Sequence, residues 1–418
     1  MIWLGAAGLI GLSAQSGSCA APAGQAASVQ VVLGESVFNT EWAPASAPGV
    51  ARRGLGPLFN AASCAACHPN GGHGEGPAGN GSTPAALVVQ LQTPGPDLAA
   101  EADGDPVYGR VFNTRAVNGA QAEGVVTISY REIEGRYYPD GMRWRMREPH
   151  YRLTGLTLGP LAAQTVIKPR LAPPLFGVAL LEAVPASAID GAATARDANP
   201  PRSAPMRGRF GWQGDSASIR DQTAKAFARE MGLATIDTPH DDCTAAEADC
   251  LRRPDSGVPE VSGELLEAVV GYVRTLVVPA PAVRTELGAG GTALFASLGC
   301  AACHRPELPV VLTDASGTQT AATIAPYTDL RLHDLGIEMA DETASGEKVT
   351  SRWRTASLWG LGHRIRTETH PTFLHDGRAR SPEEAILWHA GEAAQARRNF
   401  VNLWGRPREM LLRWLETL

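Results

Sequence analysis

The sequence contains few lysines and no long block of one charge. Only three of its 37 basic residues are lysines, Lys168, Lys225 and Lys348, and the formal net charge is −6. No basic run can follow a phosphate backbone, so a nucleic-acid partner is not expected. No apolar stretch reaches the roughly 18 to 20 residues of a membrane span. With 418 residues and 44% hydrophobic residues, the chain is long and apolar enough to form two or three globular domains.

The first residues form a short apolar block followed by small residues, as in an export signal. Residues 1–27 are therefore expected to be an export signal or a disordered N-terminus, although no basic residue opens the block. A signal would place the protein in the periplasm. Lipid attachment at Cys19 is an open alternative, although the sequence lacks the leucine that usually lies three positions before such a cysteine.

The cysteines give the strongest signal in the sequence. Four of the seven lie in two identical pentapeptides, Cys64-Ala-Ala-Cys67-His68 and Cys300-Ala-Ala-Cys303-His304. Two thiols at this spacing can bond to one porphyrin, with the adjoining histidine as an iron ligand. A thioredoxin-type redox pair and half of a zinc site are the alternatives. Two copies that each end in histidine favour two covalently bound c-type haems.

The two pentapeptides belong to an internal repeat. A short helical pattern precedes each of them, and an amphipathic helix ends each unit, at residues 263–276 and 408–418. We therefore predict a mainly α protein with two cytochrome c-type domains, at residues 28–280 and 281–418. The first is enlarged by an insertion with long loops and a β-hairpin, with strands at 125–133 and 142–147. Residues 188–205 are expected to form a surface loop.

A second iron ligand is expected from the second unit. Ser381 and Glu384 form a capping box for a helix that carries His389 on its apolar face. His389 is thus the candidate sixth ligand of the iron held by His304, and a hydrogen-bonded core histidine is the alternative. His375 is the second choice.

The first unit offers no comparable ligand, so its iron is expected to have an open site. His73 lies close to His68 in the sequence, but such a loop histidine is more often solvated. Glu123 and Arg115 could serve as the acid/base group and the cation that peroxide cleavage needs, whereas a surface pair is the simpler interpretation.

Several segments carry a family resemblance: the pentapeptide at 64–68, Gly208-Arg-Phe-Gly-Trp212, the pentapeptide at 300–304, Leu332-His-Asp-Leu-Gly336, Phe373-Leu-His-Asp-Gly-Arg-Ala379 and Ile386-Leu-Trp-His-Ala-Gly-Glu392. The chain resembles the di-haem oxidoreductases, which are similar to the bacterial dihaem cytochrome c peroxidases. The resemblance implies that the haem of His68 is peroxidatic and that the haem of His304 and His389 supplies its electrons. It also implies calcium between the domains as a further possibility.

The sequence departs from those peroxidases because no tryptophan lies just before the pair Arg115 and Ala116. The peroxidases carry a tryptophan at that place, between the haems. The possible substitutes are Trp212, Trp353, Trp359 and Trp388.

Two functions remain open. The first is a periplasmic enzyme that reduces hydrogen peroxide or a similar oxidant with electrons from a small redox protein or small-molecule donor. The second is a dihaem electron carrier without substrate chemistry. In an oxidising compartment Cys243 and Cys250, which belong to neither motif, are expected to form a disulfide.

Overall fold

The computed structural model describes residues 29–50, 52–93, 103–190, 208–240, 242–251, 258–282, 285–314, 316–349 and 352–418. The expected N-terminal signal and most of the expected loop at 188–205 lie outside these residues. The protein is 31% helical and 23% strand, so the predictions of a mainly α fold and of two cytochrome c-type domains were wrong. Several small sheets are present. They form from the inserted residues of the first half and from segments of the second half that carry no strong strand pattern.

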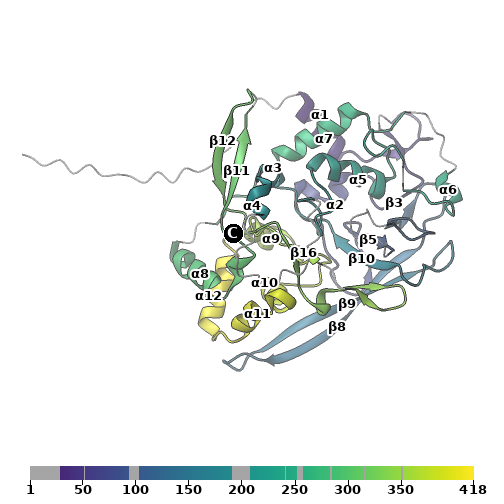
Figure 1. The fold of residues 1–418 in the computed structure, drawn as a ribbon. Helices are drawn as coiled ribbons and strands as arrows, with labels where there is room; N and C mark the ends of the chain where they lie inside the picture. Colours follow the sequence, from purple (N-terminus) through teal and green to yellow (C-terminus); the bar gives the residue numbers. More distant parts are fainter. Residues whose placement is uncertain are drawn as a thin grey trace, which may run out of the picture.

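The helices are short and lie mainly around the edges of the molecule (Figure 1). Their bounds are α1 Val29–Asn39, α2 Cys64–Cys67, α3 Val178–Glu182, α4 Ala186–Asp190, α5 Ile219–Met231, α6 Ala248–Leu251, α7 Gly263–Thr275, α8 Thr285–Ser297, α9 Leu361–Thr367, α10 Pro382–Leu387, α11 Ala394–Val401 and α12 Gly405–Leu415.

The first core forms where α1, α3, α5 and α7 pack together. Ser262 caps α7 by accepting a hydrogen bond from the backbone of Leu265, and the apolar stripe predicted for this helix is buried. Gly34 of α1 lies so close to α7 that a Cβ atom there would overlap the carbonyl of Ala268. The close approach of the two helices therefore requires glycine at this position.

A five-stranded sheet joins distant parts of the chain. Its order is β15-β14-β10-β5-β6, with β5 Leu87–Gln92, β6 Val111–Phe112, β10 Val166–Leu171, β14 Asp341–Thr343 and β15 Lys348–Val349. Alternate residues of β5 are buried, and Leu87, Val89 and Leu91 pack into a core beneath the sheet. Because β14 and β15 come from the second half of the sequence, residues from both sides of the predicted boundary at 280 build this sheet. That boundary itself stays a prediction.

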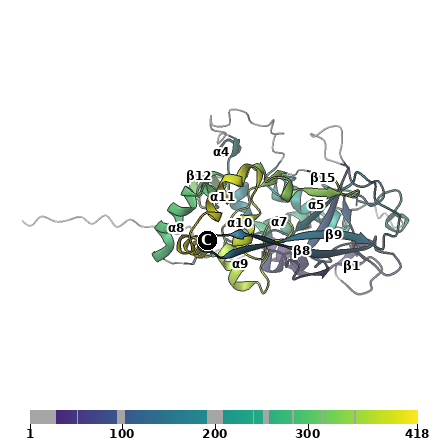
Figure 2. The same ribbon diagram turned by 90° about the horizontal axis from the view of Figure 1, so that it is seen from below.

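The predicted hairpin is present and longer than expected. Its strands are β8 Val125–Tyr137 and β9 Arg143–Thr154, which pair antiparallel, and β4 Gly81–Ser82 adds a third strand. The hairpin extends as a long arm along one side of the molecule (Figure 2). Its turn is fastened to the second half, since Arg408 pairs with Asp140 at 2.8 Å and the Tyr138 hydroxyl donates to Glu383.

The other strands form pairs of two: β1 Ala43–Pro44 with β2 Arg53–Leu55, β3 Leu58–Phe59 with β7 Arg115–Ala116, β11 Leu308–Thr313 with β12 Gln319–Ile324, and β13 Leu332–Asp334 with β16 Arg352–Arg354.

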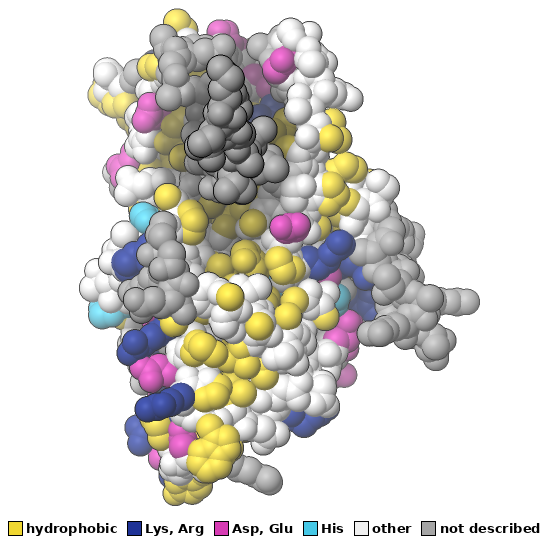
Figure 3. All heavy atoms as spheres, turned by 90° about the vertical axis from the view of Figure 1, so that its left-hand side faces the viewer, with side chains coloured by type: hydrophobic (Ala, Val, Ile, Leu, Met, Phe, Trp, Pro, Cys, Tyr) yellow, Lys and Arg dark blue, Asp and Glu magenta, His cyan; other side chains and the backbone are white. Residues whose placement is uncertain are grey.

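The second core lies between α8, α10, α11 and α12. The C-terminal helix predicted at 408–418 corresponds to α12, whose buried residues include Leu411, Trp414 and Leu415. Gly291 of α8 lies directly against the Trp414 ring, where a Cβ atom would overlap it. On the face that lies to the left in Figure 1, where α8 and α12 are found, apolar side chains gather over the middle and lower part (Figure 3).

Two further expectations can be compared with the structure. The disulfide between Cys243 and Cys250 is present, as predicted. Within the described ranges, no helix is long and apolar enough to cross a membrane.

The fold depends on a buried ion pair between β10 and β14. Arg170 donates to both carboxylate oxygens of Asp341, at 2.9 and 2.7 Å, and both side chains are at most 5% exposed. Burial opposes ionisation of Asp341, but Arg170 outweighs it and lowers the pKa of that carboxyl to about 2. Asp341→Asn should therefore destabilise the protein by about 3–5 kcal/mol, because it leaves a buried guanidinium without its counter-charge.

Denaturant unfolding at pH 7 measures this loss, and Glu342→Gln on the same strand is the matched control. The Glu342 side chain is 50% exposed, so its change should stay within about 0.5 kcal/mol. The folded pKa of Asp341 is depressed, so the pair stabilises the fold above the unfolded value of about 3.9, and this contribution is lost as pH falls towards 2. Equal unfolding midpoints for the two variants would contradict this role.

Candidate functional site

One cavity of about 1220 Å³ reaches both pentapeptides. Its walls include Cys64, Cys67 and His68 of the first motif, and Cys300, Cys303 and His304 of the second. This volume exceeds the roughly 300–1,000 Å³ of a pocket for one small ligand. The cavity can therefore enclose more than one large group, with an attachment motif for each.

The local fold presents both motifs in the same way. The first is the short helix α2, which Ser63 caps through the backbone of Ala66, and the second is a single 3₁₀ turn at Cys300–Ala302 that follows α8. In each motif the histidine backbone N–H donates to the carbonyl of the first cysteine, Cys64 or Cys300. The turn thereby sets the imidazole beside the two thiols.

The thiols do not behave as a redox pair. All four motif cysteines are free in the structure, and burial raises the pKa of Cys64 and of Cys67 to about 12 and that of Cys300 to about 11. Reactive C-x-x-C pairs instead have a thiol whose pKa is lowered, to about 3.5–7.5. The thioredoxin-type alternative is therefore disfavoured at both motifs.

His389 faces His304 across the second half of the cavity. The two ring centres are 6.3 Å apart, and both residues line the cavity. A metal–imidazole bond is about 2 Å and the ring centre lies about 1 Å beyond the nitrogen, so two rings on opposite sides of one metal ion have centres about 6 Å apart. The observed spacing fits one iron between them.

Backbone carbonyls orient both rings. The Nδ1 atom of His304 lies 3.0 Å from the carbonyl oxygen of Tyr327, and that of His389 lies 2.7 Å from the carbonyl oxygen of Ala385. Histidines that bind metals commonly donate their other ring N–H in this way, which leaves Nε2 for the metal. Burial lowers the pKa of His304 to about 4 and also lowers the pKa of His389, so both rings are neutral, as ligation requires.

The cavity wall also contains a cation suited to a haem carboxylate. Arg354 is half-buried, and its Nε donates to the carbonyl of Gly211 at 2.9 Å, whereas its Nη1 is shielded from solvent and has no hydrogen-bond partner among the described residues. Burial lowers the pKa of Arg354 to about 10, which leaves it charged at neutral pH. A haem propionate is the kind of group that would satisfy this N–H. The residues present therefore fit haem.

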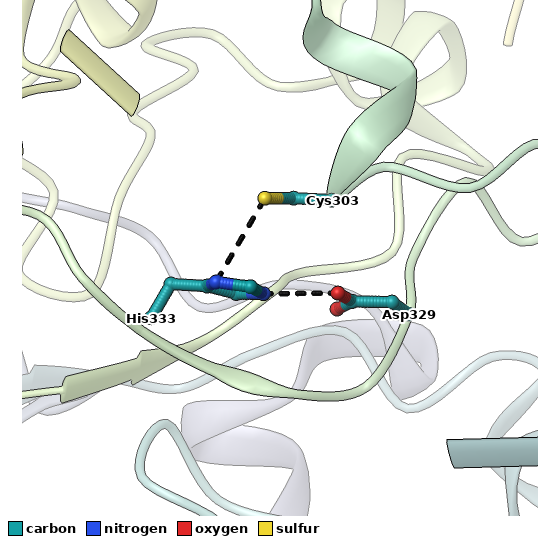
Figure 4. Close-up of side chains that lie close together, drawn as sticks. All are labelled: Cys303, Asp329 and His333. Carbon is teal, nitrogen blue, oxygen red and sulfur yellow. Dashed lines mark hydrogen bonds and ion pairs between the residues drawn. The ribbon is translucent and has the colours of Figure 1, made fainter. Parts of the chain in front are cut away.

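A zinc site is a poorer explanation. In the described part of the chain, one group of possible metal ligands comes together, Cys303, Asp329 and His333 (Figure 4). It omits Cys300 and His304, so neither motif is gathered into a four-ligand site. His333 is instead held by carboxylates, with Nε2 2.9 Å from Asp329 and Nδ1 2.8 Å from Glu392. Although burial opposes the charge, these hydrogen bonds, together with the one to Cys303, raise the pKa of His333 to about 12.

The first half of the cavity lacks such a facing pair. Burial lowers the pKa of His68 to about 4, and His68 acts electrostatically on His73, although no ring contact between the two occurs among the described residues. His73 is only 4% exposed and lines the same cavity, so the expectation of a solvated loop histidine was wrong. Met231 lines the cavity as well. The structure thus shows a paired imidazole at the second motif alone.

Glu123 and Arg115 do not line the cavity, although the charge of Arg115 acts on the Cys67 thiol. Arg115 is exposed on β7, and Glu123 is buried, where it accepts hydrogen bonds from the backbone and side chain of Asn113. Burial, followed by a hydrogen bond to Glu247, raises the pKa of Glu123 to about 10. The geometry of these contacts gives no support to the predicted roles of Glu123 and Arg115 in peroxide cleavage.

Two charged residues that line the cavity, Glu230 and Lys168, were missed from the sequence, and Trp353 and His375 line it as well. From the sequence, Trp353 is one of four tryptophans that could lie between the haems, and His375 is the second choice for the sixth iron ligand. His375 instead stacks on Trp353, with ring centres 3.6 Å apart and planes at 17°. No motif marks Glu230 or Lys168, because an isolated charged residue in a helix or strand is usually exposed.

The family model described as "Di-haem oxidoreductase, putative peroxidase" matches residues 198–418, more than half of the chain. The chain belongs to this family. The match confirms the resemblance that its motifs suggested, and with it an oxidoreductase that uses haem. No curated protein matches the chain.

Among solved structures, one similar chain is from the hydrazine synthase of Kuenenia stuttgartiensis, in crystals pressurised with xenon. The identity is 17% and the TM-score 0.26, and the match covers 42% of this chain and 63% of that one.

The facing imidazoles lead to a spectroscopic prediction. His389→Ala should convert the haem held by His304 from low-spin to high-spin, because it removes the sixth ligand. The ferric absorption and electron paramagnetic resonance spectra measure the change. His370→Ala is the control, since His370 is exposed in the loop after α9. Unchanged spectra for His389→Ala would contradict the assignment.

Proposed function

We propose that this protein is a periplasmic c-type dihaem enzyme that reduces hydrogen peroxide or a similar oxidant. Cys64, Cys67 and His68 hold the haem at which the oxidant reacts, and Cys300, Cys303, His304 and His389 hold the haem that supplies electrons. The observation that carries this proposal is the single cavity that reaches both motifs but places a facing histidine pair at only one. The bound haems would supply the electrons and the iron at which the O–O bond is cleaved.

Peroxide reduction consumes two protons and two electrons for each peroxide and yields two water molecules. A proton source beside the first motif is therefore required, and Glu230 is the carboxyl best placed for it. Glu230 lies at the end of α5, and its carbonyl accepts hydrogen bonds from the backbone of Asn60 and Ala61, just before Cys64. Its side chain lines the cavity, and its charge acts on the Cys67 thiol.

Glu230 is also poised to exchange a proton near neutral pH. Burial raises its pKa to about 7, although Arg229 and the Asn60 side chain favour the charged form. Its Oε2 atom is buried and has no hydrogen-bond partner among the described residues. In the proposed reaction this carboxyl delivers protons to the bound oxidant and regains them from solvent.

A continuous set of contacts links the first motif to His375. Gly74, which follows His73, donates its backbone N–H to the carbonyl of Ala172 at 2.9 Å. The neighbouring residue, Leu171, ends β10 and donates to the carbonyl of His375 at 2.7 Å. Backbone hydrogen bonds through Leu171 and Ala172 therefore link His375 to the segment that follows the first motif.

From His375 the contacts continue to the second motif. Trp353, which stacks on His375, is the ladder partner of His333, and His333 lies 3.9 Å from the Cys303 sulfur. We propose that the stacked rings of Trp353 and His375 carry electrons between the two sites. The cation of Arg170 lies 4.6 Å above Trp353 and disfavours a positive charge on that ring.

The electron donor, a small redox protein or small molecule, and the periplasmic location remain proposals. Oxidised Cys243 and Cys250 agree with an oxidising compartment. Calcium remains an expectation from the family resemblance: across the described ranges, carboxylates form no cluster of possible metal ligands other than the one that includes Cys303.

Two covalent haems are the first requirement of the proposal. The mass of the denatured protein should exceed that of the processed chain by two haems, and Cys300→Ala with Cys303→Ala should remove one. As a control, replacing Cys243 and Cys250 with serine should retain both haems. Haem-free protein that contains zinc would refute the proposed function.

Peroxide turnover tests the proton source. Glu230→Gln should lower turnover by about 10²- to 10⁴-fold, because it removes an acid/base group without changing the shape of the side chain. With wild-type protein, turnover should fall as pH rises through about 7, since the raised pKa keeps Glu230 protonated only below that value. If Glu123→Gln abolishes turnover and Glu230→Gln does not, the sequence-based assignment is the correct one.

A further inference from the structure

One face of the β5–β10 ladder forms a polar wall of the cavity. The register pairs Lys168 with Gln90, so side chains of alternate residues on the two strands share this face. The cavity-lining side chains on it are Val88, Gln90, Gln92, Val166, Lys168 and Arg170. The opposite face packs into the core beneath the sheet. The polar residues are thus directed into the cavity and not into bulk solvent.

Lys168 is the unusual member of this wall. It is only 9% exposed, and its Nζ atom donates to the side-chain oxygen of Gln92 at 2.7 Å. No carboxylate forms an ion pair with it among the described residues. The other two lysines do have acidic partners, since Lys225 pairs with Asp221, and Lys348 lies near Glu148 and Glu342.

The charges around Lys168 do not compensate it. Arg170, on the same strand, is neutralised by its two hydrogen bonds to Asp341. Burial and then Arg170 lower the pKa of Lys168 to about 8, whereas Asp215 and Asp341 act in the opposite direction. At neutral pH the wall therefore carries a buried ammonium with one neutral partner. Such burial is costly unless an anion accompanies the charge.

We propose that Lys168, Gln92 and Gln90 form a site for a carboxylate or other small oxyanion on the wall of the cavity. The ammonium has three donors, of which one is used by Gln92, and the Gln90 amide adds donors from the opposite strand. The proposal rests on the proposed function in one respect: the same cavity holds the haems. The carboxylate has two possible sources, a propionate of the first haem or a free anionic substrate.

Sodium formate is the probe for a free anion, titrated into the ferric holoprotein and followed by haem absorption and by calorimetry. If the site takes a free anion, wild-type protein should bind formate saturably, and more weakly at pH 9 than at pH 7, because the ammonium loses its proton. Lys168→Met should weaken binding by about tenfold or more, the loss expected for a charge-assisted hydrogen bond. Lys168→Arg should retain binding.

If a propionate fills the site, wild-type protein should not bind formate there. Instead, Lys168→Met should lower the midpoint potential of the first haem, because loss of a nearby cation favours ferric iron. The propionate would stabilise the ammonium and raise the pKa of Lys168, so this difference in potential should persist from pH 7 to 9. Spectroelectrochemical titration measures both quantities.

Lys348→Met is the matched control, since it removes one positive charge from the same sheet at a side chain that is 37% exposed. The proposal is overturned if Lys168→Met and Lys348→Met agree in formate affinity and in first-haem potential. It is equally overturned if wild-type protein binds no formate and Lys168→Met leaves the first-haem potential unchanged. Haem content is measured first, and a missing haem would contradict the proposed function, whereas calorimetry still tests the anion site.

Discussion

The relative position of the two motifs depends on how two distant parts of the chain pair around one large cavity. The cavity of about 1220 Å³ reaches both motifs, so its walls fix how the two motifs are placed relative to each other. The antiparallel pairing of β10 with β14 provides such a wall, and the buried pair of Arg170 and Asp341 fixes it. Since β10 follows the first motif and β14 follows the second, this wall also sets the two motifs in a common space.

The same burial that closes the cavity sets the protonation states of its groups. It holds His304 and His389 neutral, so their nitrogen lone pairs are available to a metal. It also raises the pKa of Glu230 towards neutrality and lowers that of Lys168. The pKa values of the Glu230 carboxyl and the Lys168 ammonium are thus shifted towards the same pH range from opposite directions. One physical cause, burial, therefore shifts the pKa values of all four groups.

The disulfide is confirmed, and the helix α10 lies where its local capping signals predicted it, whereas haem attachment and the role of His389 stay predictions. The capping box of Ser381 and Glu384 defines the helix α10, and Ser381 does accept from the Glu384 backbone. The fold class was wrong because the strands β5, β10, β11 and β12, of six residues each, and β13 to β16, of two or three residues, were not recognised. The shortest of these strands leave no alternation in the sequence, and pairing with distant strands stabilises them.

The missed residues have a different explanation. Glu230 lies in an ordinary amphipathic helix and Lys168 in a short strand, where the sequence indicates solvated charges. They become unusual only when a cavity forms beside them, which is a property of the tertiary structure. Glu123 shows the converse, since it was considered as an acid/base group for peroxide cleavage or as part of a surface pair, whereas the fold buries it beside Asn113 and Glu247.

The asymmetry between the two motifs is the strongest argument for division of labour. Identical pentapeptides and similar local turns bring each histidine to the cavity, so the motifs themselves do not distinguish the sites. The difference arises from the surroundings: the turn after α10 places His389 opposite His304, whereas Glu230, at the end of α5, lies beside the first motif and is the proton source in the proposed function. A paired imidazole fills the last coordination position and favours electron transfer. A proton donor in place of a ligand favours chemistry, so the elements around each motif, and not the motif, determine what each site does.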